Sequence, residues 1–379
     1  MAAPGLIGGT CKGAIHFAMT HSEPGGLREI WNDVAAGLSE RGHRVERFVL
    51  YPGGDEAQRI HAQAEGWHHV MRQRARGALA MPRLVFALVA YLRRMRPAVV
   101  VTAMPFANVL MPLAVRIAGT GTRVYLSHHS PADTHNRALA RLDAMTGQSA
   151  TVVRIICVSD AVSASLDDRP GRYKAKRVTI HNALPASVEG TIDRLRGDLG
   201  TERTPGRIVA LGRLSHQKNY PMLLRAMAYV PEGTLDIVGA GEDEAQLRAL
   251  AAECGVHDRV RFLGQMSRAQ ALAHAATGQV FVQVSHYEGH SLALIEAARL
   301  GLPLVVSAVP VQLEGITAPD GERCGIAVRI GDDAELGTVL ARLLSDPVEC
   351  GVWSARARKL AGAASNQAMI DEYERLLVA

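Results

Sequence analysis

The sequence has few aromatic residues and no cluster of cysteines. Aromatic side chains make up 4% of the 379 residues and no nucleic-acid recognition motif occurs, so a nucleic-acid partner is not expected. The five cysteines are scattered, odd in number and without CxxC or Cys/His spacing, which supports neither a disulfide framework nor a zinc site. This cysteine usage favours a reducing, cytoplasmic location.

Long apolar segments are also missing. The longest uncharged stretch, residues 97–115, is interrupted by threonine, asparagine and prolines, which favours a strand, a loop and a helix over a membrane span. Residues 1–13 contain one lysine and no long apolar core, so they do not predict a signal peptide. With 48% hydrophobic residues, a chain of this length can bury a large core and is expected to form two domains.

Acidic residues are absent between Glu65 and Asp133, where nine arginines occur. Residues 1–184 hold 23 Lys/Arg against 13 Asp/Glu, so only the first half of the chain is basic. One hypothesis is a surface that meets anionic lipid or a phosphate-bearing acceptor; the alternative is an arginine-rich surface from a GC-biased genome. Residues 83–94 are apolar nearly all round, which favours a helix buried against a sheet over a membrane-surface helix.

Short apolar runs alternate with helical patterns along the whole chain. They occupy residues 14–20, 45–50, 99–104, 123–127, 154–158, 207–211, 235–238, 260–263, 280–284, 304–307 and 327–330. Continuous apolar strands separated by helices predict an α/β fold with two doubly wound, Rossmann-like domains. Glycine, proline and charged residues predict an interdomain linker over residues 183–206, and the last helix is predicted near residues 366–377.

Two glutamates stand eight residues apart around a predicted strand-to-helix turn. Glu288 lies in the turn after residues 280–284, and Glu296 lies inside the helix predicted over residues 291–300. The unpaired NH groups of a helix N-terminus suit a phosphate or diphosphate. The two carboxylates are therefore placed to hold hydroxyl-bearing groups on either side of a diphosphate, as in a nucleotide-sugar. The alternative is a capping carboxylate and a solvated helix glutamate.

Two cations follow the first predicted strand of the second half. Arg213 and Lys218 come after Gly212, at the carboxyl end of a parallel strand, where open α/β sheets bind ligands. Guanidinium and ammonium groups suit a diphosphate, whose charge must be neutralised as the glycosidic bond breaks. The alternative is a loop with solvated cations. Residues 239–244 begin like a dinucleotide fingerprint, but three acidic residues would repel a pyrophosphate, which favours an ordinary strand-to-helix turn.

The first half carries its own candidate loops. Gly25 and Gly26 precede the helix predicted over residues 27–40, and paired glycines let the backbone approach a ligand; the alternative is an ordinary tight loop. His128 and His129 end another strand at the same sheet edge, where imidazoles can bind sugar hydroxyls or stabilise developing charge. Two adjacent histidines make a weak metal site, and a structural role for at least one is the alternative. No Asp-x-Asp occurs, so cations and a helix N-terminus are expected to act in place of a metal.

Together these segments resemble the retaining glycosyltransferases of family 4. The resemblance covers nearly the whole chain and rests on the Gly-Gly loop and on residues 156–159, 180–182, 212–218, 238–241, 260–264 and 288–296. It implies the GT-B architecture, with a cleft between two Rossmann-like domains and a C-terminal helix that crosses back to the first. Residues 1–184, with a helix at about 365–379, are expected to bind the acceptor, and residues 185–364 the nucleotide-sugar.

The resemblance also implies roles for single residues. It implies that Arg213 and Lys218 contact the diphosphate, that Glu288 and His128 contact the transferred sugar, and that Glu296 contacts the ribose. The expected catalytic residues are Arg213, Lys218, Glu288 and His128. Residues 263–266 are expected to border the base. The donor-binding set is Gly25, Gly26, Gly212, Gln265, Gly289, His290, Ser291, Leu292 and Glu296, and the acceptor candidates are His129, Asp133 and His135. His290 departs from the family pattern, which often has an apolar or aromatic residue there.

The implied activity is transfer of a sugar from a UDP- or GDP-sugar to an acceptor hydroxyl with retention at the anomeric carbon and without a metal cofactor. The expected acceptor is a sugar, a lipid-linked or a small molecule, in surface polysaccharide or glycolipid synthesis. The alternative is a nucleotide-sugar epimerase of the same fold, which needs no acceptor. The expected location is the cytoplasm, and peripheral contact with the anionic inner face of the cytoplasmic membrane is a second hypothesis.

Overall fold

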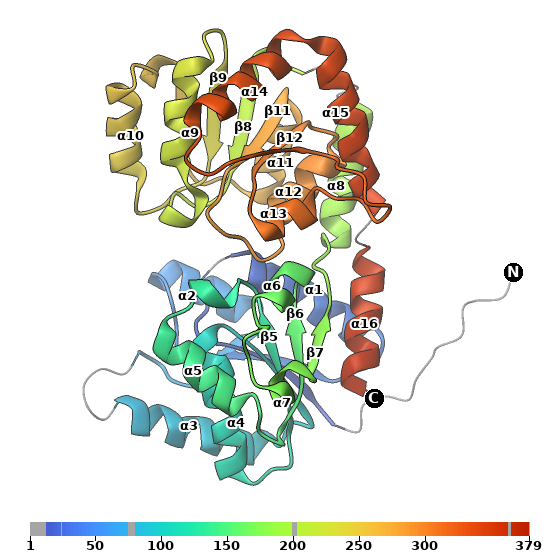
Figure 1. Ribbon diagram of the computed structural model, residues 1–379. Helices are drawn as coiled ribbons and strands as arrows, with labels where there is room; N and C mark the ends of the chain where they lie inside the picture. Colours follow the sequence, from blue (N-terminus) through green and yellow to red (C-terminus); the bar gives the residue numbers. More distant parts are fainter. Residues whose placement is uncertain (1–12, 24, 75–79, 199–202, 363–364, 379) are drawn as a thin grey trace, which may run out of the picture. The chain divides into compact units, whose positions relative to one another are not determined.

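The computed structural model describes residues 13–23, 25–74, 80–198, 203–362 and 365–378. Residues 1–13, for which no signal peptide was expected, lie outside the described residues except for Gly13. The chain forms two compact units: Met1–Asn182 with Asn366–Ala379, and Ala183–Ser365 (Figure 1). Each unit is an α/β layer structure around one parallel sheet, so the predicted α/β fold class is confirmed.

The sheet of the first unit has the strand order β3-β2-β1-β4-β5-β6-β7 over the described residues, and all its neighbours are parallel. Its strands are β1 (Ile15–Met19), β2 (Val45–Val49), β3 (Trp67–His69), β4 (Val99–Ala103), β5 (Arg123–His128), β6 (Val152–Cys157) and β7 (Arg177–Thr179). The central strands β1 and β4 are buried throughout, as expected for parallel strands covered on both faces. The edge strands β3 and β7 were not predicted.

The helices of the first unit are α1 (Gly26–Glu40), α2 (Glu56–Ala64), α3 (Ala80–Met95), α4 (Pro105–Ala118), η1 (Ala132–Thr134), α5 (Arg137–Thr146), α6 (Asp160–Ala164), α7 (Gly171–Lys174) and α16 (Asn366–Val378). The predicted last helix is therefore present as α16, and it packs on α1. Arg41, after α1, donates to Asp371 and Glu374 of α16 at 2.6 Å each. Tyr373 of α16 is fully buried, so this helix is part of the first core.

The sheet of the second unit has the order β10-β9-β8-β11-β12-β13, again all parallel. Its strands are β8 (Arg207–Leu211), β9 (Thr234–Val238), β10 (Val260–Phe262), β11 (Val280–Gln283), β12 (Leu304–Ser307) and β13 (Ile326–Val328). Successive residues of β8 enter different cores: Ile208 packs into one cluster of buried side chains and Val209 into another. The apolar residues of β8 are continuous because both faces of the sheet are covered.

The helices of the second unit are α8 (Ala186–Asp198), η2 (His216–Lys218), α9 (Tyr220–Ala226), η3 (Met227–Tyr229), α10 (Glu244–Glu253), η4 (His257–Arg259), α11 (Arg268–Ala276), α12 (Leu292–Arg299), α13 (Pro310–Gly315), α14 (Asp333–Ser345), α15 (Pro347–Lys359) and η5 (Leu360–Gly362). The chain divides between Asn182 and Ala183, at the start of the segment predicted as the interdomain linker, but helix α8 within that segment was not predicted. Val188 and Ile192 of α8 are buried at helical i, i+4 spacing, which outweighs the low helix propensity of Gly190 and Gly197.

Helix α3 contains the apolar segment 83–94. Leu84, Leu88 and Leu92 are buried, so the predicted packing of this helix is correct for one side. On the other side Phe86 is 77% exposed. Among the described residues, no helix combines the length and the apolar character that crossing a membrane requires.

Candidate functional site

An ion pair joins two of the predicted site residues at the carboxyl edge of the second sheet. Strands β8 and β11 are neighbours, so the segments that follow them meet at this edge. Lys218 ends η2 after β8, and Glu288 lies in the turn after β11. The Lys218 Nζ donates to Glu288 Oε1 at 2.7 Å. The two residues that the resemblance assigns to diphosphate and sugar are therefore in contact.

The carboxylate of Glu288 is buried, 6% exposed, and held by several donors. Besides Lys218, Gln283 Nε2 and Ser285 Oγ both donate to its Oε1 at 2.7 Å. The second oxygen, Oε2, has a longer contact of 3.3 Å from Gln217 Nε2. Because a carboxylate oxygen has two lone pairs, Oε2 is the atom with capacity for a further donor such as a sugar hydroxyl.

The N-terminus of α12 lies directly after this turn. Ser291 caps it, accepting from Leu294 N at 3.4 Å and donating to Gln283 Oε1 at 3.0 Å. Gly289 is buried and His290 is partly buried in the turn, and Leu292 begins the helix. The first NH groups of a helix have no partner within the helix, so the start of α12 brings backbone donors to the same sheet edge as Glu288.

Glu296 lies inside α12 and is buried, 6% exposed. It forms an ion pair with Arg268, the first residue of α11. Burial raises the pKa of Glu296 above its usual value, and the neighbouring guanidinium opposes that shift. Arg268 was not predicted as a site residue. Its capping box, Ser267 with Gln270, marks a helix start in the sequence but does not indicate contact with another helix.

Glycines allow the loop after β8 to pack closely. Gly212 has φ +148°, and a Cβ on it would lie 2.7 Å from Lys218 Cε. A Cβ on Gly239 would overlap the carbonyl of Gly212. The glycines of residues 239–244 thus allow the Lys218 loop to pack against this segment. This agrees with the interpretation of residues 239–244 as an ordinary strand-to-helix turn. Arg213, in the same loop, and Gln265, after β10, are exposed.

In the first unit, His128 ends β5 and is buried in a polar network. Its Nε2 lies 2.9 Å from the Tyr173 hydroxyl, which donates to Asp143 Oδ2 at 2.6 Å. Because the tyrosine has one proton, His128 Nε2 is the donor in the first contact. Burial lowers the pKa of His128, which favours the neutral imidazole. Sequence reasoning missed Tyr173 and Asp143, which have no motif spacing, and the contact of His128 with a sugar stays a prediction.

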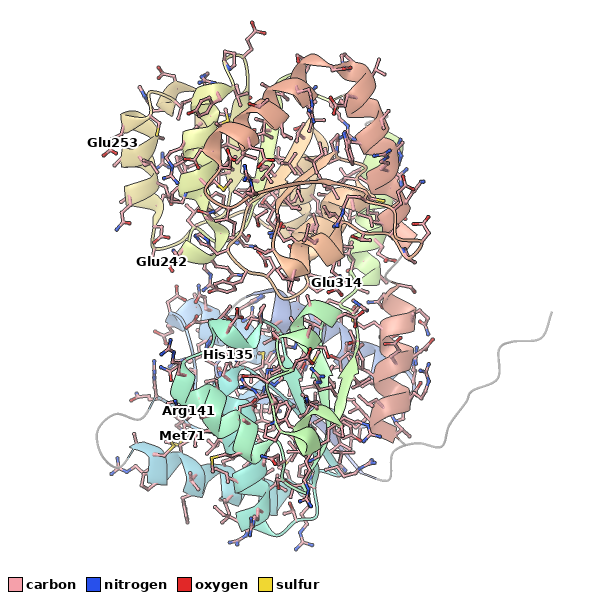
Figure 2. The ribbon with its side chains drawn as sticks, in the orientation of Figure 1. Met71, His135, Arg141, Glu242, Glu253 and Glu314 are labelled. Atoms are coloured by element: carbon pink, nitrogen blue, oxygen red, sulfur yellow. The ribbon has the colours of Figure 1, made fainter. Side chains whose placement is uncertain are left out.

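The acceptor candidates lie beside this network. His129 Nε2 is 2.9 Å from Ser127 Oγ, and burial lowers its pKa to about 3. His135, labelled in Figure 2, stacks on the His128 ring with centroids 5.9 Å apart. Burial lowers the pKa of His135 to about 4. Asp133 is exposed in η1. The edge of the first sheet therefore presents uncharged imidazoles at neutral pH.

A pocket of about 600 Å³ opens at the carboxyl ends of β1, β2 and β4. Its lining includes Thr20, His21, Glu23, Tyr51, Gly53, Arg74, Met104 and Phe106. Nearby, Gly25 caps α1 with an extended φ of 167°, and a Cβ on it would meet nothing within 4 Å. Neither conformation nor packing requires glycine at residue 25, so the folded chain gives no structural reason for it. Gly26 is the first residue of α1 and is exposed.

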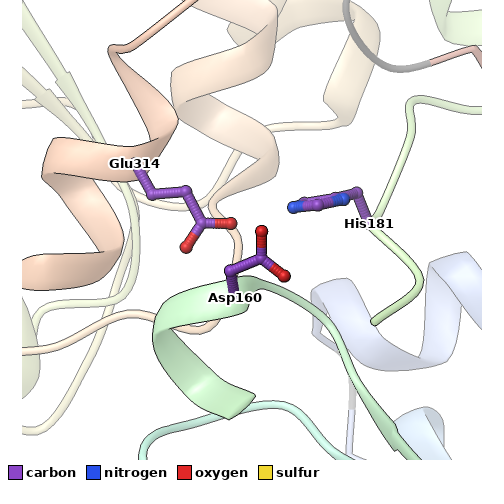
Figure 3. Close-up of side chains that lie close together, drawn as sticks. All are labelled: Asp160, His181 and Glu314. Carbon is purple, nitrogen blue, oxygen red and sulfur yellow. The ribbon is translucent and has the colours of Figure 1, made fainter. Parts of the chain in front are cut away.

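Two further polar side chains of the first unit lie close together. Asp160 begins α6 and His181 follows β7, and one ligand atom of each lies within 4.8 Å of the other (Figure 3). The third side chain in that view, Glu314, belongs to α13 of the second unit. One carboxylate and one imidazole are too few ligands for a metal site within the first unit.

Residues 191–360 match the family of glycosyl transferases group 1, and residues 24–187 match glycosyltransferase family 4. The chain belongs to the glycosyltransferases. It is 27% identical over 337 residues to the lipopolysaccharide core biosynthesis glycosyltransferase LpsD of Rhizobium meliloti, which covers 88% of each chain. It is similar to Anabaena Alr3699/HepE in complex with UDP-glucose, with a TM-score of 0.78 at 19% identity over 96% of this chain and 98% of that one.

A second solved structure, S. aureus TarM in complex with UDP and two sugar ligands, gives a TM-score of 0.75 at 11% identity over 97% of this chain and the whole of that one. These likenesses confirm the GT-B fold of this glycosyltransferase. The family matches and the similarity to LpsD place its enzyme class among the transferases, and the epimerase alternative is not favoured.

Proposed function

We propose that this glycosyltransferase moves a sugar from a UDP-sugar to an acceptor hydroxyl with retention of the anomeric configuration. The observation that carries the proposal is the contact of the partly buried Lys218 with the buried Glu288 at the carboxyl edge of the second sheet. A lysine aimed at a carboxylate that keeps one oxygen available is suited to contact a phosphate and a sugar hydroxyl that are joined in one molecule.

The donor occupies the second unit in this proposal. Arg213 and Lys218 neutralise the diphosphate together with the NH groups at the start of α12. Glu288 Oε2 accepts from the transferred sugar, and Glu296 accepts from the ribose after exchanging part of its contact with Arg268. Uracil is the preferred base, because solved structures of the same fold contain UDP, UDP-glucose, or UDP with a sugar.

Glu288 is a positioning carboxylate in this scheme and not a nucleophile. Three donors already bind its Oε1, and in this scheme Oε2 accepts from a sugar hydroxyl, so neither oxygen is directed at the anomeric carbon. The bond from the anomeric carbon to the phosphate oxygen breaks, and its electron pair stays on the phosphate. The acceptor oxygen bonds to the same face of the carbon and transfers its proton to that phosphate oxygen. The protein supplies orientation and charge stabilisation.

The acceptor is proposed to bind the first unit, in the pocket at the carboxyl ends of β1, β2 and β4, where β4 neighbours the strand β5 that ends at His128. Hydroxyl groups of a growing saccharide suit neutral imidazoles and the polar side chains of this pocket. Synthesis of a surface polysaccharide or glycolipid is the setting, as the name of the relative LpsD indicates for that protein.

A two-step experiment tests the proposal. A panel of nucleotide-sugars is first screened by thermal shift, since a ligand that binds only the folded chain raises its Tm. The stabilising donor is then incubated with and without saccharide acceptors, and the products are followed by NMR. We expect a UDP-sugar to stabilise the protein, UDP release to depend on acceptor, and the product to keep the donor's anomeric configuration. A product of inverted configuration would overturn the proposed retention, and a preference for a GDP-sugar would overturn the proposed donor. A new epimer formed from donor alone would overturn the proposed transfer reaction.

A further inference from the structure

Helices α3, α4 and α5 pack one against the next in the first unit (Figure 1). The outer surface of the first two carries large apolar side chains in contact with solvent. Phe86 of α3 is 77% exposed, and Leu113 and Ile117 of α4 are 45% and 56% exposed. Single exposed apolar residues are common, but three on two adjacent helices form a patch that the fold leaves uncovered.

The patch is continuous across the two helices. Phe86 and Arg93 are seven residues apart and so lie on the same side of α3. Arg93 donates from Nη2 to the carbonyl of Ile117 at 3.1 Å, which fixes the end of α3 against the end of α4. Leu113 precedes Ile117 by one helical turn and lies on the same side of α4.

The same two helices carry exposed arginines and no acidic residue. Arg83, Arg94 and Arg116 are exposed on the same two helices. No ion pair joins any of the three to an acidic group within the described part of the chain. The sequence contains no Asp or Glu between residues 65 and 133, so α3 and α4 bring cations alone. We call Phe86, Leu113, Ile117, Arg83, Arg94 and Arg116 the α3–α4 face.

We propose that the α3–α4 face docks on an anionic lipid bilayer. Phe86, Leu113 and Ile117 enter the boundary between headgroups and acyl chains, and the arginines bind lipid phosphates around them. The sixteen residues of α3 then lie along the membrane surface, with their buried side still packed on the first unit. This binding is independent of the donor and goes beyond the proposed transfer reaction.

The charge pattern selects a bilayer over other occupants. A second copy meeting the same face about a two-fold axis would place arginines against arginines, which like-charge repulsion disfavours. A protein partner would have to supply several carboxylates around an apolar centre. An anionic bilayer supplies both negative charge and an apolar layer at any point of its surface.

The full-length enzyme can be tested with vesicles of phosphatidylcholine alone and with phosphatidylglycerol added. We expect co-sedimentation only with the anionic vesicles, weakened by salt. The triple variant Arg83→Gln, Arg94→Gln, Arg116→Gln should partition about a hundredfold less, from about fivefold for each arginine. The matched control Arg172→Gln, Arg196→Gln, Arg375→Gln changes the net charge equally at exposed sites outside the face and should bind like the wild type.

The apolar contribution has its own readout. In the variant Phe86→Trp, the added indole should shift its emission to the blue on anionic vesicles and be quenched by brominated acyl chains. Absence of wild-type binding, or equal losses in the two triple variants, would overturn the proposal. So would an unquenched indole, or sedimentation velocity that shows the face buried in a dimer. Unchanged Tm values for all variants show that folding is intact.

Discussion

The two units share one architecture but present different chemistry at corresponding sheet edges. In the second unit, ion pairs hold the carboxyl edge: Lys218 with Glu288, and Arg268 with Glu296. In the first unit, histidines with lowered pKa values occupy the carboxyl ends of the strands. The doubly wound sheet fixes where ligands meet the protein, and the residue types decide whether that place suits a charged diphosphate or a neutral saccharide.

The largest effect should come from breaking the charged edge. Replacing Lys218 by Met, or Glu288 by Gln, should lower kcat by about 10²–10³, because each removes a fixed group that stabilises the transition state. The double variant should lose little more than either single one, since the two residues act as a pair. Turnover is measured as acceptor-dependent UDP release.

A matched control for this loss is Glu242→Gln, an exposed acid at the same sheet edge (Figure 2). It should keep normal kcat and show that net charge is not the cause. If Lys218→Met and Glu288→Gln turn over like this control while keeping the wild-type Tm, the pair is not part of the donor site.

A second contrast concerns the glycine loops of the two units. Gly239→Ala should destabilise the second unit by about 1–3 kcal/mol, because a Cβ there overlaps the carbonyl of Gly212 and the φ of +147° is strained for alanine. Gly25→Ala should change stability by less than about 0.5 kcal/mol, but lower kcat/KM if the backbone of this loop contacts a ligand. Urea unfolding and steady-state kinetics measure both. Equal destabilisation by the two substitutions would contradict the contrast.

In the first sheet, sequence patterns predicted the central strands but missed both edges, whereas both edge strands of the second sheet were predicted. Strands β3 and β7 were missed because an edge strand has one neighbour and needs fewer apolar residues: β7, for example, is Arg177-Val178-Thr179, only partly buried. Helix α8 was missed because its glycines resemble a linker. The sequence shows which residues follow each strand, but it does not show that β8 and β11 are neighbours, which requires the topology.

The same limit applies to the sites. Lys218 and Glu288 were found because each follows a strand in a recognisable pattern, although their direct contact spans 70 residues. Arg268, Asp143 and Tyr173 were missed because each acts through a partner that is distant in sequence. Such contacts depend on packing between helices and leave no local spacing.

A third prediction separates stability from binding in the charged unit. Burial raises the pKa of Glu296 above 4.5, so the folded protein favours the protonated form and loses stability as the pH rises from 4.5. Glu296→Gln removes this loss, so the Tm of the variant should rise relative to that of the wild type as the pH increases above 4.5. Its affinity for UDP should fall roughly 10- to 100-fold through a lost charge-assisted hydrogen bond. Calorimetry measures both, and unchanged UDP affinity would remove Glu296 from the ribose site.

The last prediction tests the neutral edge. The pKa of His129 falls from 6.5 to about 3 on folding, so the folded state favours the neutral imidazole. The resulting stability is complete above pH 6.5 and is lost as the pH falls toward 3. In that window each such histidine lowers the free energy of unfolding by about 1.4 kcal/mol per pH unit. His129→Gln keeps a polar partner for Ser127 that cannot be protonated, and should remove this slope.

The three tryptophans make the measurement specific to one unit. Trp31 and Trp67 belong to the first unit and Trp353 to the second, so in a Trp353→Phe background fluorescence reports the first unit alone. Urea unfolding at pH 7 and pH 5 should then show a smaller loss of stability for His129→Gln than for the parent. Equal losses would mean that His129 is charged in the folded protein, and the contrast between a charged and a neutral sheet edge would fail at that residue.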